Sequence, residues 1–197
     1  MQLRPYQTDI KNRIRNAYRQ FSAPCVVLPC GGGKSCIIAD IARSATERNN
    51  RVLVLVHRKE LREQLERTFT DWSVNMKLCD INMVQSTANK IETLPDYQFI
   101  ITDENHHGVA STYQKVYDNY PDAKRLGVTA TPVRTGEGGL AEINDTLIVG
   151  VSAKWLIENK YLAPYQYYVP RLNLDFSGVS IKQGDYDQNE AEQIVSS

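Results

Sequence analysis

A run of glycines followed by a lysine and a serine is the first feature of this sequence that could do chemistry. Gly31, Gly32, Gly33, Lys34 and Ser35 stand between an apolar stretch and a helical pattern. Glycines let the backbone approach a phosphate and point successive N–H groups at it, and a helix that begins there adds its positive dipole end. The run therefore predicts a phosphate-binding loop, in which the lysine reaches the outer phosphates and the serine hydroxyl binds Mg²⁺.

The strict loop pattern G-x-x-x-x-G-K-[ST] is not met, because Leu28 stands where its first glycine would be. The shorter core G-x-G-K-S over residues 31–35 is complete. A glycine-rich turn that precedes a lysine by chance is the alternative. The expected strand before the loop and the helix after it favour the phosphate-binding interpretation.

Two adjacent carboxylates form the second candidate site. Asp103 and Glu104 follow the apolar stretch 97–102, and in parallel α/β sheets ligands bind beyond the carboxyl ends of the strands. There Asp103 can hold Mg²⁺ through water, and Glu104 can orient and deprotonate an attacking water molecule. A solvated acidic loop is the alternative, and the presence of Lys34 upstream argues against it.

His106 and His107 raise the alternative of a transition-metal site. Adjacent histidines tend to point to different sides, and neither an H-E-x-x-H pattern nor a cysteine cluster accompanies them. The sequence therefore does not favour a transition metal here.

The elements expected to position these residues alternate between strand and helix, which predicts an α/β fold: a mainly parallel sheet with helices on both faces. Strands are expected at 25–29, 51–57, 81–85, 97–102, 125–129, 147–149 and 165–169, and helices at 5–21, 36–45, 59–69, 111–120 and 154–159. From residue 172 onward the chain becomes polar and its periodicity fades.

Composition limits the possible functions. The chain has 197 residues, 42% of them hydrophobic, which suits one domain of ordinary size. Its 23 basic and 23 acidic residues balance, so any nucleic-acid contact must be local.

Four cysteines without a C-x-x-C pair predict reduced thiols in a cytoplasmic protein. We expect no membrane span and no signal peptide.

Taken in order, the motifs resemble those of the N-terminal RecA-like lobe of superfamily 2 helicases, a P-loop NTPase domain. The resemblance is carried by five segments: residues 4–7 (RPYQ), 31–35 (GGGKS), 57–61 (HRKEL), 103–106 (DENH) and 129–131 (TAT). It is strongest to DEAH-like helicases of the type III restriction subunit and excision-repair kind, including many phage helicases. It implies a RecA-like lobe over residues 1–170 and a connector over 171–197 that leads toward a second lobe.

The resemblance also implies roles for single residues. Gln7 matches the glutamine that reads the adenine edge, and Arg4 would help to hold the base or the first helix. Thr129 and Thr131 match the hydroxyls that link the ATP site to the nucleic-acid path, with His106 as their partner. Asn105 departs from the pattern, because a small residue is usual there, and a buried asparagine needs a hydrogen-bond partner.

Three further residues are expected to touch nucleic acid. Arg58 resembles a position that contacts the nucleic-acid backbone, and Gln85 and Ser86 resemble a neighbouring strand-end segment that does the same. For all three, a solvated surface position is the alternative. The resemblance implies single-stranded DNA as the partner and leaves RNA open.

The function expected from these features is the ATP-binding motor lobe of a DNA helicase that uses ATP and Mg²⁺ in the cytoplasm of a bacterial or phage-infected cell. A double-strand DNA translocase shares the same motifs, and a nucleotide-dependent nucleic-acid-binding switch is a further alternative that Glu104 disfavours. A small-molecule kinase would need an arginine-rich lid, which the sequence lacks. The arginine that completes the site belongs to the second lobe, so we expect this chain alone to hydrolyse ATP slowly.

Overall fold

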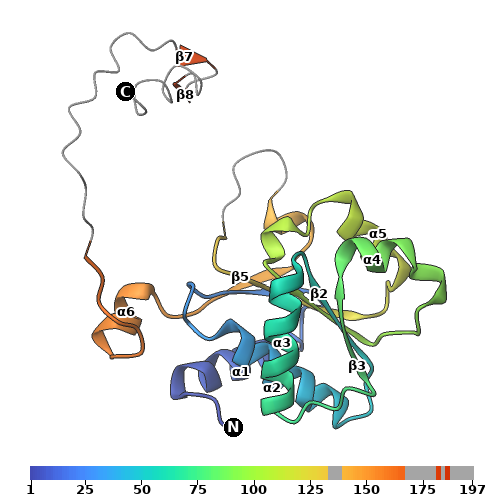
Figure 1. The fold of residues 1–197 in the computed structure, drawn as a ribbon, viewed down its shortest axis with the longest axis horizontal. Helices are drawn as coiled ribbons and strands as arrows, with labels where there is room; N and C mark the ends of the chain where they lie inside the picture. The colour runs from blue at the N-terminus through green and yellow to red at the C-terminus, as the bar shows by residue number, and fades with distance from the viewer. Residues whose placement is uncertain (133–138, 167–180, 183–184, 187–197) are drawn as a thin grey trace. The chain divides into compact units, whose positions relative to one another are not determined.

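A single six-stranded parallel sheet organises the chain (Figure 1). The computed structural model describes residues 1–132, 139–166, 181–182 and 185–186. The strand order is β3-β2-β4-β5-β1-β6, and every pairing in this sheet is parallel. The strands are β1 (Pro24–Val27), β2 (Val52–Val56), β3 (Cys79–Met83), β4 (Phe99–Asp103), β5 (Lys124–Thr129) and β6 (Thr146–Val149). The predicted α/β, RecA-like architecture is confirmed.

Helices cover both faces of the sheet. One face carries α1 (Pro5–Ala17), α2 (Lys34–Thr46), α3 (Lys59–Asp71) and α6 (Ala153–Glu158), and the other carries α4 (Val84–Asn89) and α5 (Ser111–Asn119). Short 3₁₀ turns complete the set: η1 (Ile91–Thr93), η2 (Asn105–His107) and η3 (Leu140–Glu142). This layering explains why β1, β2 and β4 are buried on both faces.

Strand β2 shows how the two cores are divided. Its five residues are fully buried. Val52, Val54 and Val56 join the core beneath α1, α2 and α3, whereas Leu53 and Leu55 join the core beneath α4 and α5. The alternation follows from the two-residue period of a strand, which sends successive side chains to opposite faces.

One predicted strand is wrong at its end, and this affects two candidate residues. The sequence predicts a strand over 81–85, but β3 covers Cys79–Met83 and pairs in register with the whole of β2. Immediately after β3 the chain turns into α4, so Gln85 and Ser86 are helical. The reason is a helical apolar spacing, since Val84, Ala88 and Ile91 all enter the core. Similarly, the helix expected over 5–21 ends at Ala17.

The chain divides into two units, Met1–Ala163 and Pro164–Ser197. In the second unit, β7 (Ile181–Lys182) and β8 (Asp185–Tyr186) form an antiparallel pair. The strand expected over 165–169 has no counterpart at residues 165–166, and its remainder lies outside the described residues. Within the described ranges, no helix has the length and apolar character needed to cross a bilayer.

Candidate active site

The predicted site residues lie at the carboxyl ends of five parallel strands. The glycine loop follows β1, Arg58 follows β2 and Gln85 follows β3, while Asp103 and Thr129 are the last residues of β4 and β5. Parallel strands present their carboxyl ends at one edge of the sheet, which is where α/β proteins bind ligands. The fold therefore brings residues as far apart in the sequence as Gly31 and Thr129 to one edge.

Two glycines of the loop adopt a conformation that other residues rarely take. Gly31 has φ of 75° and Gly33 has φ of 77°, a left-handed region that glycine enters without steric cost. The environment also excludes a side chain at Gly33, because a Cβ atom there would lie 2.3 Å from Gln7 Nε2. Helix α2 begins at the next residue, Lys34, so its free N–H groups face the loop.

The start of α1 is tied to this loop by hydrogen bonds. Gln7 is buried, with 3% of its surface exposed. Its Nε2 lies 3.4 Å from the carbonyl oxygens of Gly32 and Gly33, and its Oε1 accepts a 2.9 Å hydrogen bond from the Arg4 backbone N–H. The Tyr6 hydroxyl donates to the Gly32 carbonyl at 2.9 Å. Gln7 thus contacts the loop whose ligand it is expected to recognise.

An aromatic cluster beside the loop includes two residues from α6 and the turn after it, where the sequence predicts a helix but no site residue. The Trp155 and Tyr161 rings stack with centroids 5.8 Å apart, and Tyr6 meets Tyr161 edge-on at 5.1 Å. The Arg4 guanidinium lies 5.0 Å from the Tyr161 ring centre, a cation–π contact. Trp155 and Tyr161 carry no motif and lie far from the loop in sequence. Only an excess of aromatic residues after the last strand could have drawn attention to them.

Glu104 links Lys34, the residue after the glycine loop, to the end of β4. Its backbone is left-handed, with φ of 50°, a strained conformation for a residue other than glycine and one that clusters at functional sites. Its Oε1 lies 3.8 Å from Lys34 Nζ, and its Oε2 lies 3.4 Å from His106 Nδ1. The side chain that is expected to activate water is therefore held between a lysine and a histidine.

The contacts continue from His106 to the end of β5. His106 Nδ1 lies 3.0 Å from Thr129 Oγ1. Thr129 is fully buried, and its hydroxyl lies 3.2 Å from the Thr131 carbonyl oxygen and accepts a 3.1 Å hydrogen bond from the Thr131 N–H. The structure thus joins the three residues expected to couple the two functions, His106, Thr129 and Thr131, in one chain of contacts with Glu104.

Asp103 is more deeply buried than Glu104, and its pKa is raised. It is 7% exposed, and its Oδ1 accepts a 3.0 Å hydrogen bond from the Glu104 N–H. Burial, followed by the negative charge of Glu104, raises the pKa of Asp103 to about 6. A nearby cation would reverse this destabilisation of the charged form.

These properties fit Mg²⁺. Among the described residues, no group of three or more His, Cys, Asp and Glu side chains is arranged to hold a metal ion. Mg²⁺ does not need such a cage, because it is commonly bound by one or two protein oxygens, substrate phosphates and water. Asp103 supplies a buried carboxylate whose charged form a cation would stabilise, and Ser35 supplies a hydroxyl beside the glycine loop.

The residues expected to touch nucleic acid are all exposed. Arg58 precedes α3 as its N-cap residue, and Gln85 and Ser86 lie in the first turn of α4. Gln85 also lines a cavity of about 260 Å³ together with His57 and His107, whose rings are 4.9 Å apart. Burial, followed by the charge of Arg58, lowers the pKa of His57.

Asn105, the departure from the expected pattern, has the partners that its burial requires. It is 2% exposed. Its Nδ2 donates a 3.1 Å hydrogen bond to Asn144 Oδ1 and lies 3.5 Å from Cys25 Sγ. Asn105 therefore packs behind the site and leaves the carboxylates of Asp103 and Glu104 in place.

Comparisons with known proteins show the family of the chain. The sequence matches the family described as "Type III restriction enzyme, res subunit" over residues 1–93 and 76–134. A 51.5 kDa protein of Lactococcus phage (isolate 7-9) is 45% identical over 85% of this chain and 37% of its own length. The "Putative ATP-dependent helicase IRC3" of Saccharomyces cerevisiae is 27% identical over 93% of this chain and 31% of its own length. The chain thus spans about a third of these relatives.

Solved structures share the fold at low sequence identity. A nuclease-deletion mutant of the Type ISP restriction-modification enzyme LlaGI, in complex with a DNA substrate mimic, gives a TM-score of 0.65 at 17% identity over 82% of this chain and 21% of that chain. The UvsW helicase from bacteriophage T4 gives 0.61 at 15% identity over 76% of this chain and 60% of that one. Together with the family match, these findings show that the chain belongs to the type III restriction enzyme res subunit family and has the N-terminal RecA-like lobe of superfamily 2 helicases.

Proposed function

We propose that residues 1–170 are the ATP-binding lobe of a DNA helicase in which ATP hydrolysis drives strand translocation or unwinding. The observation that carries the proposal is the contact between the loop and the acidic strand end, with Lys34 Nζ 3.8 Å from Glu104 Oε1. Phosphoryl transfer to water needs a cation at the phosphates and a base beside the attacking water, and this pair would supply both.

In the proposed reaction, the loop amides and Lys34 bind the β- and γ-phosphates. Ser35 and Asp103 would hold Mg²⁺, which neutralises charge on the phosphate oxygens when it is bound. Glu104 orients the water and accepts its proton as the oxygen attacks the γ-phosphorus. The bond between the γ-phosphorus and the β–γ bridging oxygen breaks in the same reaction, so that ADP leaves and inorganic phosphate forms. The pair of hydrogen-bonding groups on Gln7 suits the adenine edge, provided that the Gln7 amide exchanges its contacts with Arg4 and the loop for contacts with the base.

The contacts of Glu104 also suggest how hydrolysis would be coupled to movement. His106 lies within reach of both Glu104 and Thr129, so loss of the γ-phosphate can alter the position of Thr129 and Thr131 through one side chain. We propose that this segment passes the nucleotide state to the nucleic-acid path.

The proposed partners are ATP, Mg²⁺, DNA in single-stranded form and a second RecA-like lobe, with the cytoplasm as the place of action. DNA is favoured over RNA because the structural neighbours LlaGI and LlaBIII are described in complex with a DNA substrate mimic and bound to DNA. A second lobe is included because the matched part makes up only 37% and 31% of two relatives' own length and because these motors complete their site with an arginine from another lobe.

The deciding experiment is an ATPase assay of this chain and of the longer phage relative. Each would be measured alone and with single-stranded DNA, double-stranded DNA or RNA, beside its Lys34→Ala variant or the equivalent variant of the relative. Stimulation of the longer protein by single-stranded DNA, with little hydrolysis by the isolated chain, would support a helicase. Stimulation by double-stranded DNA alone would instead support a double-strand translocase. Equal rates with and without every nucleic acid would refute the motor function.

A further inference from the structure

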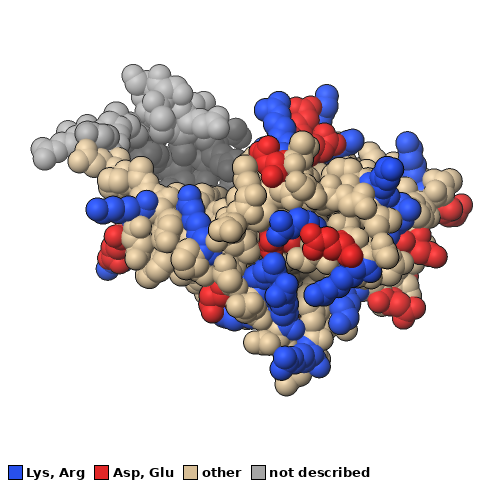
Figure 2. Space-filling view, turned by 90° about the horizontal axis from the view of Figure 1, so that it is seen from below, with Lys and Arg blue, Asp and Glu red and all other residues tan. Residues whose placement is uncertain are grey.

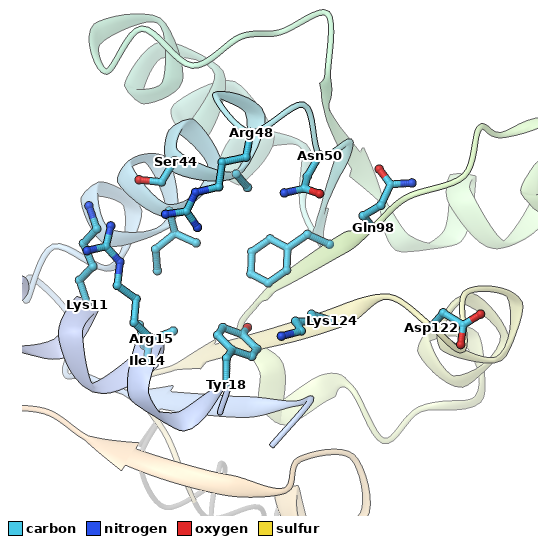
Figure 3. A pocket seen from close by; sticks show the side chains of 13 residues that line it. Lys11, Ile14, Arg15, Tyr18, Ser44, Arg48, Asn50, Gln98, Asp122 and Lys124 are labelled. Carbon is cyan, nitrogen blue, oxygen red and sulfur yellow. The ribbon is translucent and has the colours of Figure 1, made fainter. Parts of the chain in front are cut away.

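Figure 3 shows a second cavity, which is lined by the first residues of β4 and β5. It therefore lies at the opposite edge of the sheet from the candidate active site, which is at the carboxyl ends of the strands. It has a volume of about 650 Å³ and is lined by the C-terminal halves of α1 and α2 and by the first residues of β4 and β5. Buried side chains of Ile14, Ile41 and Phe99 form its floor. Helix α2 begins at the phosphate loop and ends at this cavity, so its 13 residues, at ~1.5 Å each, place the two sites about 20 Å apart.

Positive charge dominates the cavity. Arg15, Arg48 and Lys124 are exposed at its rim, and no salt bridge joins any of them to a carboxylate in the part of the chain that the structure describes. Figure 3 shows the guanidinium groups of Arg15 and Arg48 turned into the space between α1 and α2, whereas Asp122 lies apart from them.

The two lysines that line the cavity already have partners. Lys11, which also lines it, is paired with the buried carboxylate of Asp40. The Lys124 ammonium lies 5.2 Å from the centre of the Tyr18 ring, and the Tyr18 hydroxyl donates to the Arg125 carbonyl at 2.8 Å. The two arginines therefore remain as the groups that an anion could bridge.

We propose that this cavity binds an organic phosphate of nucleotide size. A guanidinium group offers paired N–H donors that match a phosphate group, and two of them with an ammonium nearby match a doubly charged one. A volume of about 650 Å³ lies within the range of cavities that hold small organic ligands, roughly 300–1,000 Å³. The floor and Ala45 offer apolar surface to the organic part, and Ser44 and Asn50 add polar groups at the wall. The ligand is either a free nucleotide or the phosphorylated end of a nucleic-acid strand.

The test is a titration of the isotope-labelled 197-residue chain followed by amide NMR. The probes are thymidine 5′-monophosphate, inorganic phosphate, and a short oligothymidylate with either a 5′-phosphate or a 5′-hydroxyl. We expect amides of residues 11–18, 44–50, 98–99 and 124 to shift with the first probe. Amides of residues 30–36 report separately on the phosphate loop, so failure of one site is not confused with failure of the other.

Substitutions test whether the arginines hold the phosphate. We expect Arg48→Gln to weaken binding of thymidine monophosphate at this cavity at least fivefold, and Arg15→Gln to do the same. Arg67→Gln, an exposed arginine outside the cavity, should change it less than twofold. Equal binding by all three variants, or shifts confined to residues 30–36, would overturn the proposal.

The remaining probes identify the source of the ligand. Binding of the monophosphate alone would support a free nucleotide, and added binding of the phosphorylated oligonucleotide would support a strand end. If the 5′-hydroxyl strand binds as tightly as the phosphorylated one, the terminal phosphate is not recognised and the proposal fails. It also fails if inorganic phosphate binds as tightly as the monophosphate, because the organic part then contributes nothing.

Discussion

Glu104 is held at the end of β4 from two sides, and this position defines its chemistry. Lys34 lies 3.8 Å from one carboxylate oxygen and His106 lies 3.4 Å from the other. Its left-handed backbone places the carboxylate beyond the strand, whereas Asp103 remains 7% exposed within it. Two neighbouring acids thus occupy different environments, which is how similar side chains take different roles.

Exchange of Glu104 for Gln should separate binding from hydrolysis. Glutamine keeps the size of the side chain but cannot accept the proton of the attacking water, so we expect the ATP hydrolysis rate to fall about 100-fold or more. ATP affinity should change less than threefold. The measurement is a single-turnover hydrolysis assay beside a nucleotide-binding titration, with Glu92→Gln as an exposed control. Hydrolysis that survives in Glu104→Gln would remove Glu104 from the role of base.

Asp103 should make stability depend on pH in a defined direction. Its folded-state pKa is raised from 3.8 to about 6, so the folded protein binds this proton more tightly than the unfolded chain does. The stabilisation of the folded state by this proton is therefore fully present below about pH 4 and is lost as pH rises through 6.

Asp103→Asn should abolish this dependence. The variant should therefore gain stability relative to the native chain as pH rises from 4.5 to 7.5, by on the order of 1–3 kcal/mol. Urea unfolding without nucleotide or Mg²⁺ at the two pH values measures the difference. Equal differences at both values would show that Asp103 is not destabilised by burial. Addition of ATP and Mg²⁺ at pH 7.5 should stabilise only the native chain.

At the scale of elements, the turn after β4 packs against β5 through the side chain of Asn105. Asn105 in η2 bonds to Asn144, which precedes β6, and its amide covers the backbone of Gly127 in β5. A Cβ atom at Gly127 would lie 2.3 Å from Asn105 Nδ2. The polar residue at position 105 therefore requires a glycine across from it, and the two positions should be energetically coupled.

A double-mutant cycle tests this coupling. Gly127→Ala should cost about 2 kcal/mol because of overpacking, and Asn105→Ala about 1–2 kcal/mol because Asn144 loses a partner. The double variant should be more stable than the sum predicts by roughly 1–2 kcal/mol, since alanine at position 105 makes room for the new methyl group. Strict additivity of the free energies of unfolding would contradict the contact.

At the scale of the whole molecule, acidic and basic residues are equal in number, so any nucleic-acid binding must rely on local contacts. Acidic and basic side chains are interspersed over the face shown in Figure 2, in keeping with 23 of each sign. Nucleic-acid binding by such a surface depends on a few cations and on backbone groups. Arg58 is exposed at the carboxyl edge of the sheet, and we propose it as one of these cations.

Arg58→Ala should weaken DNA binding roughly three- to tenfold and reduce the slope of log affinity against log salt by about one, because one phosphate contact is lost. Fluorescence anisotropy over a range of salt concentrations measures both quantities. Arg67→Ala, exposed further along α3, is the matched control and should leave the slope unchanged. An unchanged slope in Arg58→Ala would place the DNA path elsewhere.

The sequence by itself determined the fold class and the strand–loop–helix arrangement around the glycine run, because short stretches of sequence specify both. A buried parallel strand such as β2 is apolar at every position, and a glycine run between a strand and a helix has few structural alternatives. The end of β3 was misplaced because Val84 suits a strand by residue type, whereas the helical spacing of Val84, Ala88 and Ile91 in the core sets the switch to α4. The role of each site residue remains a prediction.

Only the tertiary structure decided which distant residues meet. The amide of Gln7 on the carbonyls of Gly32 and Gly33, and the fit of Asn105 against Gly127, join segments with no shared local pattern. The basic cavity is built from side chains of α1, α2, β4 and β5. Periodicity reports which face of an element is buried, but the partner of that face depends on the strand order of the sheet, which local sequence does not specify.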